Sequence, residues 1–137
     1  WGEAPDTADV WVGDSLGEMA LYFGMSHVAL LGGSFAPLGG QNLIEAAACG
    51  VPVFMGPHLF NFTEASTLAA EAGAAQRCED IAHAVTEAAA TAGDAARLHG
   101  MQDAALGLGA AHRGAALKTA TEVAAVVRRG GRSLLSN

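Results

Sequence analysis

Short runs of hydrophobic residues alternate along the chain with longer stretches whose apolar positions recur at helical spacing. Three strong runs cover residues 10–12, 27–31 and 51–55, and a weaker fourth covers residues 74–78. Near-continuous apolar runs of this length are typical of strands that are buried on both faces of a parallel sheet. The pattern therefore predicts an α/β fold, a Rossmann-like parallel sheet with flanking helices.

The stretches between and after these runs predict helices. We expect them over residues 16–23, 42–48, 61–72, 80–92, 95–106 and 110–127. Ser15 and Glu18 fit a capping box at the start of the first helix, in which the Glu side chain reaches back to the cap N–H. Gly50 and Gly73 stand where helices commonly end, and Asp80 is expected to cap the helix over residues 80–92. The tail, residues 128–137, is basic and rich in glycine and serine, and we expect it to be flexible.

Two glycine-rich loops follow predicted strands and are the strongest candidates for a binding site. The first contains Gly32-Gly33-Ser34 and Gly39-Gly40-Gln41-Asn42, and the second contains Gly56-Pro57-His58. In parallel α/β sheets, ligands bind beyond the carboxyl ends of the strands, where these loops are expected. A helix that starts near Asn42 offers unpaired N–H groups to a phosphate, and the glycines allow a ligand to approach the backbone closely.

The charge distribution narrows the ways in which an anion could be held there. The formal net charge is −7, which argues against a nucleic-acid partner. All 7 Lys and Arg residues lie at or beyond Arg77, and residues 1–76 contain none. An anion bound in the first half would therefore depend on backbone N–H groups and helix ends, or on residues from elsewhere. Glu45 could accept hydrogen bonds from ribose hydroxyls, although it also stands three residues after Asn42 in a capping arrangement.

Two other functions remain open from the residues alone. The stretch Gly13-Asp14-Ser15-Leu16-Gly17 matches the G-x-S-x-G pattern of a nucleophile elbow, and Asp80 with His83 supplies a D-x-x-H pair. A small GDSL-type esterase with Ser15 as nucleophile is one alternative, although Ser15 is already explained as a helix cap. A non-catalytic Rossmann-like module used for protein contact is the other. The sequence lacks a D-x-D motif and a Cys/His cluster with zinc spacing, so we expect no metal site and no cofactor.

Taken together, the loops resemble the motifs of one glycosyltransferase family. The stretches are GDSLGEM at residues 13–19, LLGGSFAPLGGQNLIEAAACGVPVFMGPHLFNF at residues 30–62 and HRGAALK at residues 112–118. In order and spacing they are similar to motifs of the C-terminal domain of bacterial 3-deoxy-D-manno-octulosonic acid (Kdo) transferases. The similarity runs from Val10 to about Lys118, and the combination is more specific than any one motif.

The resemblance implies an enzyme of the two-Rossmann-domain (GT-B) type. Such enzymes transfer Kdo from CMP-Kdo to a lipid A precursor in lipopolysaccharide biosynthesis, at the cytoplasmic face of the inner membrane. It implies that residues 1–127 are part of the C-terminal nucleotide-sugar-binding domain, and that the general base lies in an N-terminal domain of the same enzyme. We therefore expect no catalytic residue in this chain, which alone would be inactive. The implied donor-site residues are Gly17, Glu18, Gly39, Gly40, Gln41, Asn42 and Glu45, with Ser34, Pro57, His58 and Asn61 at the rim.

Four positions depart from the usual wording of the family motifs. Gln41 stands where the family usually has His, Ala46 where it often has Pro, and His112 where it usually has Asn. Ser15 replaces Thr, which keeps a hydroxyl and weakens the esterase interpretation. Gln41 argues against a proton-dependent role at that position. A related GT-B enzyme that uses a UDP-sugar remains an alternative within the same class.

Overall fold

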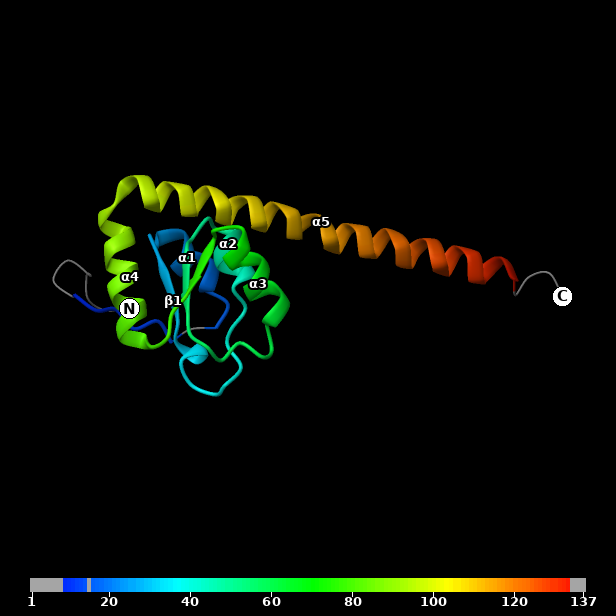
Figure 1. Ribbon diagram of the computed structural model, residues 1–137. Helices are drawn as coiled ribbons and strands as arrows, with labels where there is room; N and C mark the ends of the chain where they lie inside the picture. The colour runs from blue at the N-terminus through cyan, green and yellow to red at the C-terminus, as the bar shows by residue number, and fades with distance from the viewer. Residues whose placement is uncertain (1–8, 15, 134–137) are drawn as a thin grey trace.

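The fold is a small parallel sheet with helices packed on both faces (Figure 1). The computed structural model describes residues 9–14 and 16–133. Its strands are β1 (Ala29–Leu31), β2 (Val53–Met55) and β3 (Ala75–Arg77), in the order β1-β2-β3. Its helices are α1 (Met19–Met25), the short 3-10 turn η2 (Gly32–Ser34), α2 (Ile44–Ala48), α3 (Thr63–Glu71), α4 (Ile81–Gly93) and α5 (Ala95–Ser133).

The central strand β2 is buried on both faces because its side chains alternate between two apolar clusters. Val53 and Met55 belong to a cluster with residues of α1, α2, α3 and α5, whereas Phe54 belongs to a second cluster with residues of α4. Parallel strands need such cover on both faces, and the predicted Rossmann-like parallel sheet is confirmed. Helix α5 crosses the end of the sheet opposite to the loop that follows β1 (Figure 1), so that loop is left uncovered by α5.

Several helix boundaries follow from local signals and agree with the prediction. Asp80 caps α4, since its carboxylate accepts a hydrogen bond from the His83 N–H at 2.8 Å. Gly50 and Gly73 follow α2 and α3 with φ angles of 72° and 78°, the left-handed region that glycine adopts without steric cost. Asp94 caps the start of α5 in the same way as Asp80 caps α4.

The first predicted strand is not formed. Val10, Trp11 and Val12 pair with no strand of the described residues, and their side chains are 78%, 62% and 86% exposed. A strand is stabilised by its ladder hydrogen bonds and by packing against neighbouring strands, and this segment has neither within the described part of the chain. The prediction of a strand at residues 10–12 is therefore wrong.

The predicted capping box at the start of α1 is also wrong. The helix begins at Met19 rather than Leu16, and its first residues have no side-chain cap. The Glu18 carboxylate instead accepts a hydrogen bond from the Tyr22 hydroxyl at 2.6 Å, so it is not available to the helix start. Ser15, the other half of the predicted box, lies outside the described residues.

The two helices predicted at the C-terminal end are one continuous helix. Helix α5 runs for 39 residues and passes through Gly107 and Gly109, where we expected a break. Gly109 is buried against α2, and a Cβ at this position would lie 2.7 Å from the Cα of Ala48. This glycine therefore allows two helices to pack closely, and it does not end a helix.

The far half of α5 extends away from the sheet (Figure 1). It includes residues 128–133, which the sequence analysis assigned to a flexible tail, whereas residues 134–137 lie outside the described part. No helix among the described residues has an apolar stretch long enough to cross a membrane. The helix thus ends later than expected, and the division into residues 1–127 and 128–137 stays a prediction.

Candidate functional site

The two glycine-rich loops leave the sheet at the same edge. Leu31, the last residue of β1, is paired with Met55, the last residue of β2, and Met55 is paired with Arg77 at the end of β3. Because the strands are parallel and in register, the loops of residues 32–43 and 56–62 start side by side. This carboxyl edge is where ligands bind in parallel α/β sheets.

The two loops also contact each other directly. The Asn61 N–H donates to the Gly39 carbonyl at 3.3 Å, and the φ angles of Gly39 and Gly40 are 90° and 83°. A Cβ on Gly39 would lie 2.7 Å from Cε2 of Phe60, and a Cβ on Gly40 would lie 2.8 Å from Cδ2 of Leu59. Both glycines are thus required by the backbone conformation and by the closeness of the second loop. The fold brings the predicted site residues Gly39, Gly40 and Asn61 together.

Asn42 and Glu45 form a small polar unit at the start of α2. The Asn42 Oδ1 accepts the Ile44 N–H at 3.1 Å, and the Asn42 Nδ2 donates to the Glu45 Oε1 at 3.2 Å. The helix therefore starts two residues later than expected, with Asn42 bonded to its first turn. Both polar side chains are exposed. These two residues therefore cap the start of α2, and the exposed Glu45 carboxylate remains accessible to a ligand hydroxyl.

Gln41, Pro57 and His58 lie on the outside of the same edge. Gln41 and Pro57 are exposed, and His58 is half-buried. The side chain of Gln41 packs beside Gly33, since a Cβ on that glycine would lie 3.6 Å from the Gln41 Cγ. Their exposure leaves these side chains able to reach a ligand that lies on the two loops.

Ser34 does not lie at the rim of the loops, where we expected it. Its side chain is 0% exposed. Its hydroxyl donates to the Leu31 carbonyl and accepts the Gly56 N–H, the latter at 2.7 Å. Ser34 therefore connects the two loops from the interior, a placement that depends on tertiary packing and that the motif alone does not reveal.

Gly17 and Glu18 are engaged within their own segment. Gly17 has a φ of 86°, and the Glu18 carboxylate is bonded to the Tyr22 hydroxyl at 2.6 Å. This hydrogen bond, with smaller contributions from burial and from the charges of Glu18 and Asp14, raises the pKa of Tyr22. Among the described residues, the Glu18 carboxylate is bonded to Tyr22 and not to the glycine-rich loops. A role for Gly17 and Glu18 in the donor site stays a prediction.

The D-x-x-H pair of the esterase alternative is part of a helix cap. The Asp80 carboxylate accepts the backbone N–H of His83 at 2.8 Å, and the His83 Nδ1 accepts the Glu79 N–H at 3.5 Å. A catalytic triad needs a hydrogen bond between the carboxylate and the imidazole. Here the Asp80 carboxylate bonds to the backbone of His83 and not to its imidazole. The proposed nucleophile, Ser15, lies outside the described residues.

Arg77 brings to the carboxyl edge a positive charge that the sequence motifs do not reveal. It ends β3, and its Nη2 donates to the Ser66 Oγ at 3.1 Å and to the Thr67 Oγ1 at 3.0 Å, both on α3. Both partners are neutral hydroxyls, and within the described residues Arg77 has no ion pair with a carboxylate. Its charge is therefore free to act on an anion near this edge. Its position at a strand end was the signal that could have found it.

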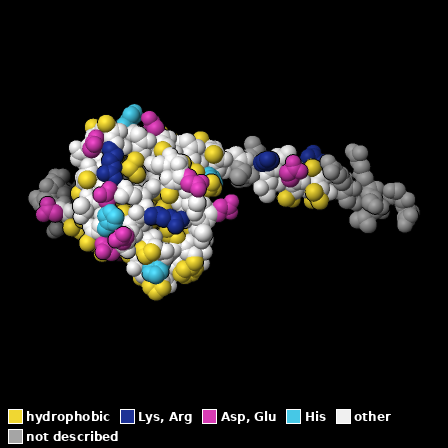
Figure 2. Space-filling view, in the orientation of Figure 1, with side chains coloured by type: hydrophobic (Ala, Val, Ile, Leu, Met, Phe, Trp, Pro, Cys, Tyr) yellow, Lys and Arg dark blue, Asp and Glu magenta, His cyan; other side chains and the backbone are white. Residues whose placement is uncertain are grey.

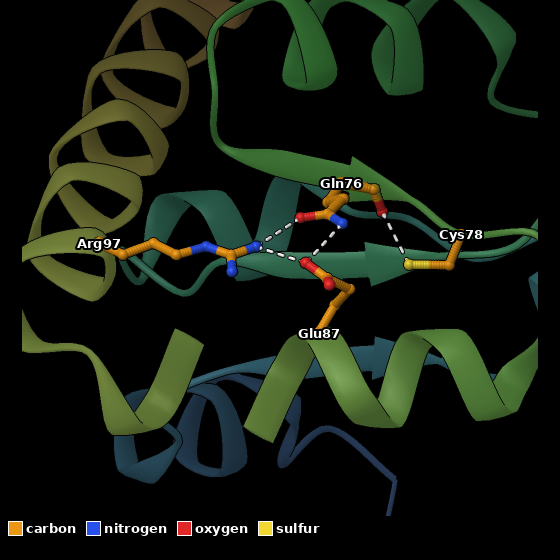
Figure 3. Close-up of polar contacts among 4 residues, drawn as sticks. All are labelled: Gln76, Cys78, Glu87 and Arg97. Carbon is orange, nitrogen blue, oxygen red and sulfur yellow. Dashed lines mark hydrogen bonds and ion pairs between the residues drawn. The ribbon is translucent and has the colours of Figure 1, made fainter. Parts of the chain in front are cut away.

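A second polar cluster lies where α4 and α5 meet β3 (Figure 3). The Arg97 Nη2 lies 2.7 Å from the Glu87 Oε2 and donates to the Gln76 Oε1 at 2.8 Å, while the Gln76 Nε2 donates to Glu87 at 3.0 Å. The hydrogen bond from Arg97 and then that from Gln76 lower the pKa of Glu87. The cluster thus joins α4, α5 and β3 through contacts among its own members.

The surface of one face carries isolated charges. Figure 2 shows Lys and Arg side chains separated from one another and interspersed with acidic ones, with no continuous basic patch on this face. In the described part of the chain, no group of three or more His, Cys, Asp or Glu residues is placed to hold a metal ion. Binding of an anion on this face would therefore use single charges and backbone groups.

Comparison with solved structures defines the class of protein. No family model matches the chain. The chain is similar to the crystal structure of the C-terminal CMP-Kdo binding domain of WaaA from Acinetobacter baumannii, with a TM-score of 0.66 and 28% identity, over 70% of this chain and 50% of that chain. Together with the parallel sheet and its glycine-rich carboxyl edge, this similarity shows that the chain has the Rossmann-like fold of the C-terminal domain of a GT-B glycosyltransferase.

Curated relatives specify the family. The chain is 49% identical over 118 residues to the 3-deoxy-D-manno-octulosonic acid transferase of Bordetella pertussis, which corresponds to 86% of this chain and 28% of the relative. It is 44% identical over 59 residues to the Haemophilus influenzae protein of the same name, or 43% of this chain and 14% of that relative. The chain is thus a homologue of part of the Kdo transferases, which confirms the resemblance of its motifs. The roles of individual donor-site residues stay predictions.

Proposed function

We propose that this chain is the donor-binding part of a glycosyltransferase that moves Kdo from CMP-Kdo to a lipid A precursor in lipopolysaccharide biosynthesis. The observation that carries the proposal is the convergence of two glycine-rich loops at one edge of the sheet. This convergence occurs in a chain that is similar to a CMP-Kdo binding domain. CMP-Kdo is the ligand of the proposed site, with no additional cofactor.

The phosphate of the donor is proposed to lie against residues 39–42, ahead of α2. The second loop occupies the space beside Gly39 and Gly40, so their role is to set the course of the backbone through their left-handed conformations. N–H groups of residues 39–42 are proposed to bind the anion. Arg77 adds a positive charge at the same edge of the sheet, without a carboxylate partner among the described residues. Glu45 is proposed to accept hydrogen bonds from the ribose hydroxyls, while Asn42 orients its carboxylate through the 3.2 Å contact.

The second loop is proposed to contact the sugar end of the donor. His58 and Asn61 carry groups that can donate hydrogen bonds to the phosphate or to the sugar carboxylate. Their loop is already held against Gly39 by the Asn61 N–H. Gln41 and Pro57 complete this rim, and Gly17 with Glu18 is proposed to approach the donor from the preceding segment.

The proposed reaction requires a part of the enzyme that this chain does not contain. A base in the N-terminal domain removes the proton of the acceptor hydroxyl, whose oxygen bonds to the anomeric carbon as the bond to the CMP phosphate breaks with inversion. The chain spans 28% of the length of the Bordetella relative, so the rest of such an enzyme would supply the base and the acceptor site. We propose that the whole enzyme works at the cytoplasmic face of the bacterial inner membrane. This chain alone should show no transfer of Kdo.

Titration of the ¹⁵N-labelled chain with CMP, CDP and UDP tests the donor site. We expect CMP to shift the backbone amide signals of Gly39, Gly40, Asn42 and Glu45, because the proposed phosphate and ribose contacts lie there. Tighter binding of UDP than of CMP would favour an enzyme that uses a UDP-sugar. If none of the nucleotides shifted any signal, the chain would be better explained as a contact module.

A further inference from the structure

We propose that Ser34 is a positioning residue that locks the two glycine-rich loops to each other and does not itself contact the ligand. The inference rests on the proposed function, because these two loops are the ones that would bind the donor. It assigns the serine of the Gly32-Gly33-Ser34 motif to the interior of the site.

Ser34 makes three hydrogen bonds, two of which join the loops. Its hydroxyl donates to the carbonyl of Leu31, at the end of β1, and accepts the N–H of Gly56, just after β2, at 2.7 Å. Its carbonyl accepts the N–H of His58 at 2.9 Å. The side chain is 0% exposed, so water does not replace a partner that is lost. One residue of the first loop is therefore tied to the second loop at two points.

Gly56 shows how closely the two loops approach. A Cβ at this position would lie 2.5 Å from the Ser34 carbonyl oxygen and 2.6 Å from the Cδ1 of Phe35. Its φ is not in the left-handed region, so glycine is needed here for space and not for backbone conformation. The missing side chain allows the Gly56 N–H to reach the serine hydroxyl.

Loss of the Ser34 hydroxyl would leave the buried Gly56 N–H without its acceptor. An unpaired buried donor is costly, and the second loop can relieve the cost by moving away from the first. In the unmodified chain the relative position of the two loops is fixed before a ligand binds. A ligand that contacts both loops would lose this preorganisation in the variant. The lock therefore predicts a local effect on loop opening and on affinity, beyond any effect on global stability.

Ser66 is a matched control within the same chain. It is also 0% exposed, and its hydroxyl donates to the Thr63 carbonyl at 3.0 Å and accepts from the Arg77 Nη2 at 3.1 Å. These bonds join α3 to β3 and do not join the two glycine-rich loops. Ser34→Ala and Ser66→Ala each remove one buried hydroxyl with two hydrogen bonds, so their global effects should be similar.

The test measures amide hydrogen exchange and CMP affinity in the unmodified chain, Ser34→Ala and Ser66→Ala. We expect Ser34→Ala to speed exchange at Gly56 and His58 by about tenfold relative to the rest of the sheet. We also expect it to raise the Kd for CMP by about tenfold. Ser66→Ala should change exchange at Gly56 and His58 by no more than about twofold. It is a control for exchange and not for affinity, because Ser66 also accepts a hydrogen bond from Arg77.

Each outcome decides the proposal. Unchanged exchange at Gly56 and His58 in Ser34→Ala, or the same local effect in both variants, would overturn the lock. Failure of the unmodified chain to bind CMP would refute the proposed function alone, because exchange at these two amides still reports the lock. If Ser34→Ala does not fold, hydrogen exchange in the unmodified chain tests the proposal instead. Because Ser34 holds both amides, Gly56 and His58 should open in the same event, with equal free energies of opening. Different free energies of opening would contradict the proposal.

Discussion

The carboxyl edge of the sheet and the corner between α4 and α5 are held together by opposite chemistry. At the edge, a serine hydroxyl, backbone groups and close glycine contacts join two loops. At the corner, Gln76, Glu87 and Arg97 form a closed set of charged and polar contacts. At the corner the charge of Arg97 is paired with that of Glu87, whereas at the edge Arg77 donates to neutral hydroxyls. The difference teaches that a binding edge needs polar or charged groups that the fold itself does not pair.

The largest expected effect comes from closing the space between the two loops. Gly56→Ala would place a methyl group 2.5 Å from the Ser34 carbonyl oxygen, and this backbone atom cannot move aside as a flexible side chain can. We expect the free energy of unfolding to fall by about 3 kcal/mol, as measured by urea denaturation. Gly100→Ala is the control, because no atom beyond its chain neighbours and the backbone of its own helix lies within 4 Å of the added carbon, and it should stabilise α5 by about 1 kcal/mol. Equal, small effects of the two substitutions would contradict the close approach of the loops.

A smaller effect, on binding and not on folding, is expected at the exposed end of the edge. Glu45→Ala should weaken CMP binding by about tenfold, because one acceptor for the ribose hydroxyls is lost. Its contact with Asn42 is exposed, so the free energy of unfolding should change by less than about 0.5 kcal/mol. Glu64→Ala, at the corresponding position of α3, should leave the affinity unchanged. Early melting of Glu45→Ala with unchanged affinity would mean that Glu45 is only a cap.

At the corner, the expected effect depends on pH. Hydrogen bonds from Arg97 and Gln76 lower the pKa of Glu87 below its ordinary 4.5. The stabilisation is therefore present above about pH 4.5 and is lost as the pH falls through the lower, folded-state pKa. Glu87→Gln should reduce Tm by a few degrees at pH 7 and by less at pH 3. In an Arg97→Met background the same change should have little effect, and a difference in Tm that is constant with pH would count against the ion pair.

The smallest effect is expected where a buried hydroxyl has no partner. Thr91 in α4 is 0% exposed, and its Oγ1 has no hydrogen-bond partner among the described residues. Thr91→Val keeps the shape and removes the unpaired hydroxyl, so the free energy of unfolding should stay the same or rise by up to about 1 kcal/mol. Urea denaturation of this variant beside Ser34→Ala compares an unpaired buried hydroxyl with a paired one. A loss of more than about 1 kcal/mol would show that Thr91 has a partner in solution.

The sequence was a good guide where the signal is local. Three of the predicted strands, the helix ends at Gly50 and Gly73 and the cap at Asp80 are confirmed, because apolar periodicity and backbone preferences act within a few residues. It failed at residues 10–12, since an apolar run becomes a strand only when another strand pairs with it. It also failed at Gly109, where packing against α2 requires the glycine.

By itself, the sequence determined the order of strands and helices, the two glycine-rich loops and the family to which their motifs are related. The tertiary structure decided which groups meet. Ser34 and Gly56 are 22 residues apart and become bonded because β1 and β2 are parallel and end at the same edge. Arg97 reaches Gln76 only because α5 turns back toward β3. Contacts between distant segments depend on how the layers pack, and no local pattern in the chain encodes them.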